Sequence, residues 1–294
     1  MIRKKVGGNL LLAWMAAAGA LALHAAESKV DPTFLYRRLD SVAAQASELT
    51  TASARYKPLF GKGDSQTSVV KGLARFGELV VDAGGRSATV KHEAEEQAWF
   101  VLSGAGLLHY GQEEHSIVAE DFFYLPPGIE HSVSNSEGEP VEILVMGYFI
   151  PQGTALTLPR QLQIANTGMA KQQVVGGHPD STLYRLLMGD ITSKRDVIAA
   201  GHVLTSLFIM DIKPGGTNDP HHHAMEEEVY LILEGKGDMV AGGGMDGVEG
   251  RHPATAGDAY FIRLNATVGF YAGKGPGAGD ARILAVRSKY PFPR

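Results

Sequence analysis

The chain has 294 residues with a formal net charge of −5, and 44% of them are hydrophobic. That apolar fraction is typical of a folded globular protein and excludes disorder throughout the chain. Cysteine is absent, which excludes disulfides, thiolate metal sites and cysteine nucleophiles. The 27 basic and 32 acidic residues are mixed without long runs of one sign, so we expect no nucleic-acid partner.

Residues 1–26 are predicted to be a signal peptide. Three basic residues precede an apolar run over residues 10–23, and the small residues Ala25 and Ala26 suit cleavage. The run is shorter than the ~20 residues that a membrane-spanning helix needs. We therefore expect a periplasmic or secreted protein with no membrane span after signal removal. An uncleaved anchor or a buried helix is the alternative.

Residues 27–68 are predicted to form an N-terminal segment that is helical or irregular. The pattern Asp31-Pro32-Thr33 is typical of a helix start. Apolar side chains then recur every three or four residues, which is the spacing of one helix face; they are Leu35, Leu39, Val42, Ala46 and Leu49. We expect a short helix here that packs on the rest of the protein and carries no chemistry.

Short apolar runs separated by glycine and proline follow, and they predict an all-β fold. The 36 glycines and 14 prolines of the chain favour many tight turns. We place the two β regions at residues 69–151 and 183–294, with an irregular linker over 152–182.

The two β regions are copies of one another. The segment 92–106 recurs 131 residues later as the segment 223–237, with six of fifteen positions identical. An internal duplication of small β-barrels explains this repeat.

The second copy contains residues with the spacing of metal ligands. His221 and His223 are one residue apart, so on an extended segment they point to the same side. Glu228 follows with the parity of apolar neighbours, whereas Glu227 has the opposite parity and should face out. Two imidazoles and one carboxylate suit a divalent transition metal and leave coordination positions open. Glu226 shares the parity of Glu228 but lies closer to the turn.

With Gly215 and Gly235 at its ends, this segment resembles the first motif of the cupin superfamily, G-x5-H-x-H-x3–4-E-x6-G. Every fixed position of that motif is met, and the resemblance spans roughly residues 70–290. It implies a bicupin, with two tandem jelly-roll-type β-barrels. It also implies one divalent metal at His221, His223 and Glu228, which can be Mn, Fe, Ni, Co or Zn.

The second cupin motif normally supplies one more histidine ligand, and here the chain departs from the family. Arg263 and Asn265 stand at its proline and glycine positions, and Val268 stands at its histidine position. An extra water or His202 from a neighbouring strand can complete the coordination, or the metal is bound weakly. Arg263 and Tyr260 are the candidate catalytic residues, because Arg263 can pair with a substrate carboxylate.

The first copy retains a different part of the pattern. His92 and His131 are present, but Val90 replaces the first histidine and Gln97 replaces the glutamate, with Glu96 beside it on the outward parity. His92, Gln97 and His131 can converge as a secondary site, although an amide is a poorer metal ligand than a carboxylate. We expect instead a degenerate barrel that is kept for packing or for shaping the other site.

Together these features predict a metal-dependent bicupin enzyme that acts on a small polar molecule bearing carboxylate or hydroxyl groups. The layout is similar to ureidoglycine aminohydrolase-type bicupins, but the ligand identities differ. Aminohydrolase, dioxygenase and decarboxylase or lyase chemistry therefore all stay open. The alternative is a non-catalytic small-molecule-binding or storage-type bicupin, and a homo-oligomer is compatible with either. His178 and His252 are expected in solvated loops.

Overall fold

The computed structural model describes residues 33–61, 69–244 and 248–291. These residues all belong to one compact unit. The predicted signal peptide lies outside them. Among the described residues, no helix is long and apolar enough to cross a membrane.

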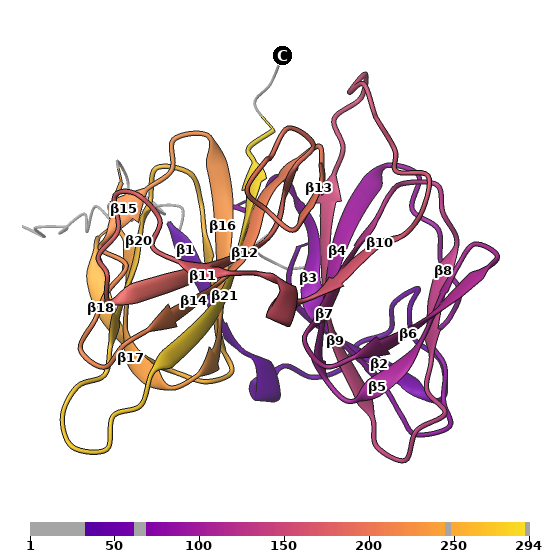
Figure 1. Cartoon of the computed structure of the whole chain (residues 1–294), viewed down its shortest axis with the longest axis horizontal. Coiled ribbons are helices and arrows are strands. Elements are labelled where there is room, and N and C mark those ends of the chain that lie inside the picture. The colour runs from indigo at the N-terminus through magenta and orange to yellow at the C-terminus, as the bar shows by residue number, and fades with distance from the viewer. Residues whose placement is uncertain (1–32, 62–68, 245–247, 292–294) are drawn as a thin grey trace, which may run out of the picture. The chain divides into compact units, whose positions relative to one another are not determined.

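The fold is all-β, as the sequence predicts, and it consists of two β-sandwiches (Figure 1). The N-terminal sandwich has a six-stranded sheet in the order β10-β7-β4-β9-β3-β2 and a three-stranded sheet in the order β6-β5-β8. Its strands are β2 (Ala54–Gly61), β3 (Leu73–Val81), β4 (Glu95–Ser103), β5 (Ala105–Tyr110), β6 (Glu113–Val118), β7 (Asp121–Leu125), β8 (His131–Ser134), β9 (Val141–Phe149) and β10 (Gln163–Asn166).

The C-terminal sandwich has the same plan. Its large sheet runs β1-β19-β16-β21-β14-β12-β11 with β13 beside β12, and its small sheet runs β15-β20-β17-β18. The strands of the large sheet are β1 (Phe34–Arg38), β11 (Gln172–Gln173), β12 (Thr182–Asp190), β13 (Ile198–Gly201), β14 (Leu204–Ile212), β16 (Glu226–Glu234), β19 (Asp258–Ile262) and β21 (Ala281–Lys289). The small sheet contains β15 (His221–His222), β17 (Lys236–Gly242), β18 (Gly250–Thr255) and β20 (Thr267–Ala272).

Apolar side chains form three cores. One core fills each sandwich between its two sheets. A third joins the large sheets of the two sandwiches, with Phe76 and Phe100 from one side and Leu207 and Phe261 from the other. Strands of the large sheets are therefore buried on both faces, which explains their continuous apolar runs. Burying each such side chain stabilises the fold by about 1.5–3 kcal/mol.

The predicted N-terminal helix is wrong, because Phe34–Arg38 is strand β1. This strand, indigo in Figure 1, pairs with β19 of the C-terminal sandwich, and Leu35 is buried in the core between the large sheets. A three-residue 3₁₀ helix, Leu39–Ser41, follows it. Edge pairing in the tertiary structure supplies the backbone hydrogen bonds, and it overrides the helical spacing of the apolar residues.

The two copies exchange their first strands. While β1 joins the sheet of the C-terminal sandwich, β10 pairs with β7 of the N-terminal sandwich. Each exchanged strand is followed at once by a 3₁₀ helix, the second being Thr167–Met169. Each strand also ends on a side-chain bond to its host, from Arg38 to Asp258 and from Asn166 to Asp121. The exchange links the sandwiches through the backbone ladders of both large sheets.

Two glutamates reinforce this link reciprocally. Glu96 of β4 accepts hydrogen bonds from the backbone N–H groups of residues 202–204 at 2.6–3.1 Å. Its counterpart Glu227 of β16 accepts from the N–H groups of Lys71 and Gly72, each at 2.8 Å. Both point away from the core of their own sandwich, as their parity predicts, but the other sandwich buries them to 0% and 2% exposure.

Candidate metal centre

His221, His223 and Glu228 come together at one end of the C-terminal sandwich. Each offers one ligand atom, and these atoms all lie within 4.8 Å of one another. His223 Nε2 is 3.3 Å from Glu228 Oε2, and the two imidazole rings are 4.9 Å apart between centroids. Nitrogen and oxygen ligands bind transition metals at about 2.0–2.2 Å. A single cation can therefore contact all three side chains after a small inward movement.

The local backbone explains how the histidines are presented. His221 lies on the short strand β15, which pairs with β20 so that His221 faces Val268. Asp219, two residues earlier, has a φ of 54°, which turns the chain sharply before the strand. Its carbonyl oxygen accepts a 2.8 Å hydrogen bond from Nδ1 of His221. That bond fixes the tautomer and leaves Nε2 as the ligand atom.

The polar atoms of the site fit a cation. His223 Nε2 and Glu228 Oε2 are buried and have no hydrogen-bond partner among the described residues, and Glu228 is only 2% exposed. Buried polar atoms nearly always have hydrogen-bond partners, and the ion-pair contacts of Glu228 with His223 and Arg287 do not supply one to Oε2. A divalent metal would satisfy both atoms. Burial lowers the pKa of His221, which favours the neutral, coordinating imidazole.

The ligands border a cavity of about 80 Å³. Three further polar atoms in its wall are buried without a hydrogen-bond partner: Tyr184 Oη, Ser206 Oγ and Arg287 Nε. Burial raises the pKa of Tyr184, and nearby Glu228 adds to the effect, so the phenol stays protonated. The cavity therefore combines metal-ligand atoms with unused hydrogen-bond donors in a space that fits only a small molecule.

Arg287, which the sequence analysis missed, is one of two arginines that line this cavity, the other being Arg195. Its Nη1 lies 3.4 Å from Glu226 Oε2, and its Nε lies 3.9 Å from Glu228 Oε1. The guanidinium also lies over the ring of Phe208, 5.4 Å from its centroid. Arg287 is on β21, directly across from Glu228 of β16. The pairing register that brings them together is not visible in the sequence.

His178 is also part of the site, although a solvated loop was expected. Its ring packs 5.3 Å from that of His221 and 5.2 Å from that of Tyr184. Its Nδ1 donates to the carbonyl oxygen of Asn218 at 2.7 Å. The loop before β12 thus closes one side of the cavity.

The residues suggested as catalytic lie elsewhere. Tyr260 is 2% exposed and packs inside the sandwich, 5.1 Å from the ring of Tyr36 on the exchanged strand. Neither Tyr260 nor Arg263 borders the cavity. His202 is not a fourth ligand, because its Nδ1 lies 3.4 Å from Glu96 Oε2 in the contact between the sandwiches. Val268 is buried opposite His221 and leaves the fourth position without a protein ligand.

In the equivalent place of the N-terminal sandwich, internal hydrogen bonds hold the amide of Gln97. His92 and His131 lie 5.7 Å apart between ring centroids. Gln97, however, accepts a 2.8 Å hydrogen bond from Trp99 and donates one to Glu95 at 3.2 Å. Burial lowers the pKa of His131 to about 4. These three predicted residues are thus near one another, but the amide oxygen that would contact a metal is already occupied.

Comparison with known proteins identifies the architecture. Residues 77–147 and 208–286 match the family model described as Cupin domain. The chain belongs to the cupin family. It is a bicupin, because each sandwich contains one of the two matches.

Solved bicupin-like structures share this fold at low identity. Protein Ylba of E. coli is 15% identical with a TM-score of 0.63, over 87% of this chain and 91% of that one. A Pseudomonas aeruginosa protein described as glyoxylate-induced is 18% identical with a TM-score of 0.69, over 89% and 91%. A deletion mutant of the oxalate decarboxylase OxdC of Bacillus subtilis is 11% identical with a TM-score of 0.62, over 87% and 77%. These identities show the fold alone.

A relative is also found by sequence. The uncharacterized protein MJ1618 of Methanocaldococcus jannaschii is 28% identical over 82 residues. The match covers 28% of this chain and 66% of that protein, so most of this chain lies outside the matched region.

Proposed function

We propose that this bicupin is a metal-dependent enzyme acting on a small carboxylate-bearing molecule in the cavity of its C-terminal sandwich. The observation that carries the proposal is the convergence of His221, His223 and Glu228, two of whose ligand atoms are buried without a hydrogen-bond partner. A divalent ion of Mn, Fe, Ni, Co or Zn suits this set. When bound, it would supply Lewis-acid polarisation of a substrate oxygen or activation of a bound water.

The side chains around the ligands support a carboxylate substrate. Arg287 Nη1 contacts Glu226 at 3.4 Å, and its buried Nε lies 3.9 Å from Glu228 and has no hydrogen-bond partner among the described residues. A guanidinium recognises carboxylates through two parallel N–H donors. The protonated Tyr184 and the hydroxyl of Ser206 add donors on the same cavity wall. They would orient the substrate, while the surrounding apolar side chains exclude water.

The reaction type within this class is open between decarboxylation or lyase chemistry, dioxygenation and aminohydrolysis. The structural neighbours include an oxalate decarboxylase, whose named substrate is a small dicarboxylate. A dicarboxylate as small as oxalate suits a cavity of about 80 Å³. The sequence of residues 1–26 supports export, and we place the activity in the periplasm or outside the cell.

Non-catalytic binding of a small molecule is the second candidate function. Val268 favours it, because a buried valine opposite His221 removes the fourth ligand and weakens the hold on a metal. A binding protein would take up the carboxylate equally well with and without metal. The enzyme would need the metal for turnover.

Metal analysis combined with turnover separates these functions. The mature chain is loaded separately with Mn²⁺, Co²⁺, Zn²⁺, Ni²⁺ or anaerobic Fe²⁺, desalted and quantified, then incubated with small mono- and dicarboxylates with and without oxygen. We expect one ion per chain and metal-dependent turnover of one carboxylate. His223→Ala and Glu228→Ala should lose the ion. His92→Ala, the equivalent change in the other sandwich, should retain it. Equal metal content in all four proteins would refute the site.

A further inference from the structure

A second, larger hollow lies on the outside of the C-terminal sandwich. It has a volume of about 540 Å³ and lies over strands β17, β18 and β20, and none of the residues around it borders the metal cavity. Met239 and Phe270 of these strands point into the core of the sandwich. Their neighbours Asp238 and Tyr271 therefore point outward, because side chains alternate along a strand. We call this hollow the outer trough.

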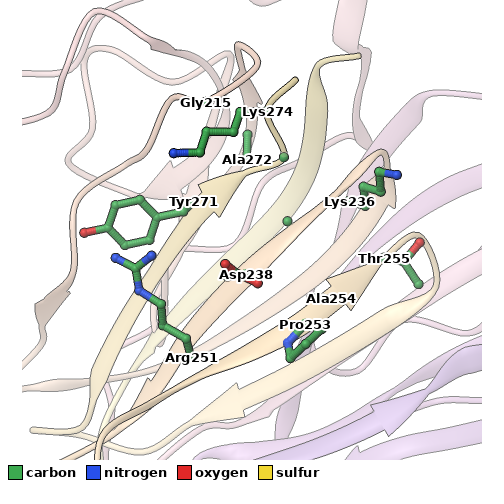
Figure 2. Close-up of a pocket in the computed structure, with 12 residues that line it drawn as sticks. Gly215, Lys236, Asp238, Arg251, Pro253, Ala254, Thr255, Tyr271, Ala272 and Lys274 are labelled. Carbon is green, nitrogen blue, oxygen red and sulfur yellow. The ribbon is translucent and has the colours of Figure 1, made fainter. Parts of the chain in front are cut away.

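Charged side chains border the outer trough. Lys236, Arg251 and Lys274 are exposed, and none of them has an ion-pair partner among the residues that the structure describes. Asp238 likewise has no ion pair there. Figure 2 shows Arg251 and the amino group of Lys274 near Tyr271 on one side, Lys236 and Thr255 on the other, and Asp238 between them. The trough is thus cationic toward both ends in a chain whose net charge is −5.

Arg251 is held in a position suited to binding an oxyanion. Its guanidinium carbon lies 3.9 Å from the centroid of the Tyr271 ring. Stacking on an aromatic ring uses the face of the guanidinium and leaves its N–H edge available. That edge is the part that binds carboxylates bidentately.

The duplicated sandwich shows that the fold does not require these charges. The pairing registers place Lys236 at the position of Ala105 and Tyr271 at the position of Ser134. They place Arg251 at the position of Glu114, which has the opposite charge. Lys236, Arg251 and the stacked ring of Tyr271 therefore belong to the C-terminal copy alone, and a shared structural role does not explain them.

We propose that the outer trough binds a short acidic saccharide, a ligand with carboxylates spaced along a hydroxyl-bearing backbone. The cations at the two ends contact its carboxylates. Asp238 between them accepts hydrogen bonds from its hydroxyl groups, which a ligand with carboxylates alone cannot offer. The volume of about 540 Å³ lies within the usual range of small-molecule sites.

Calorimetric titration with digalacturonate tests this assignment. We expect saturable 1:1 binding that weakens as salt rises, since exposed charge pairs are screened. Lactose, a neutral disaccharide, and inorganic phosphate should each bind at least ~10-fold more weakly. No binding of digalacturonate, or equal binding of phosphate, would overturn the proposal.

Variants locate the binding and identify its chemistry. The double variant Arg251→Glu with Lys274→Glu should lower digalacturonate affinity at least ~10-fold. The double variant Arg160→Glu with Lys171→Glu, a matched reversal of two exposed cations outside the trough, should not. Equal unfolding midpoints confirm that both variants are folded. Glu228→Ala, which disables the metal site, should leave binding unchanged. Loss of binding in that variant would place the saccharide in the metal cavity instead and refute the trough.

Asp238→Asn distinguishes hydroxyl recognition from simple attraction of anions. Replacing the carboxylate removes repulsion toward any dianion, so adipate, a dicarboxylate without hydroxyls, should bind more tightly to the variant. Digalacturonate should bind more weakly, because its hydroxyl groups lose a charged acceptor. Tighter binding of both ligands would show that the trough attracts anions without recognising a sugar backbone.

Discussion

Replacing Glu96 tests how the two sandwiches are held together. Its carboxylate accepts hydrogen bonds from three backbone N–H groups of residues 202–204 and from the hydroxyl of Tyr124 at 2.9 Å. In Glu96→Ala these donors lose their acceptor in a contact where the Glu96 side chain is 0% exposed. Each unsatisfied buried donor costs about 1–3 kcal/mol, and entering water recovers part of that cost. We expect a loss of about 4 kcal/mol of unfolding free energy.

The assay is urea unfolding at neutral pH, with Glu93→Ala as the control because that side chain is 71% exposed. The control should change stability by less than about 0.5 kcal/mol. Burial alone would raise the pKa of Glu96, but the hydrogen bonds from His202 and from the backbone at 202–204 lower it overall. The contribution of Glu96 to the free energy of unfolding is therefore fully present above the unfolded-state pKa of about 4.3. It is lost as pH falls through the lower folded-state pKa. A variant within about 1 kcal/mol of wild type at pH 7 would refute the anchoring role.

Two further substitutions and one pH titration test the site and its duplicate. Arg287→Met should retain the metal but bind a small carboxylate more weakly. Its dissociation constant for the Co²⁺-loaded protein, measured by visible absorption, should rise about 10–100-fold because a charged hydrogen bond is lost. An unchanged constant would contradict carboxylate recognition by Arg287. Val268→His places an imidazole opposite His221. Competition with a chelator should show that the affinity for the metal rises roughly tenfold or more. An unchanged affinity would mean that the fourth coordination position lies elsewhere. Burial lowers the pKa of His131 to about 4, so its ring signals in NMR should titrate near that value. In the unfolded chain the ring binds its proton near pH 6.5, so this residue reduces the free energy of unfolding as pH falls below about 6.5. Titration of the folded protein near the ordinary pKa of about 6.5 would contradict the burial of His131.

The candidate metal ligands could be predicted from the sequence, because their residue types and their spacing along extended segments indicate the same site. His221 and His223 are placed together by a spacing of two on an extended segment, and Glu228 by its parity on the next strand, so all three were found from the sequence. The duplication was visible because the segment 92–106 recurs nearly unchanged in polarity at 223–237.

Contacts between distant strands could not be predicted in this way. Leu35 fits a helical spacing, yet its strand is formed by pairing with β19 more than two hundred residues later. The parity of Glu96 correctly indicates that it points out of its own sandwich, but parity does not show that the other sandwich covers it. Arg287 enters the metal cavity through the register of β16 with β21, which no local motif encodes.

Anomalous diffraction from crystals of the Co²⁺-loaded protein tests the central claim most directly. The account predicts one strong peak in the C-terminal sandwich, within about 2.0–2.3 Å of a nitrogen of His221, a nitrogen of His223 and an oxygen of Glu228. A loaded protein whose only peaks lie away from these three side chains, or none at all, would contradict it.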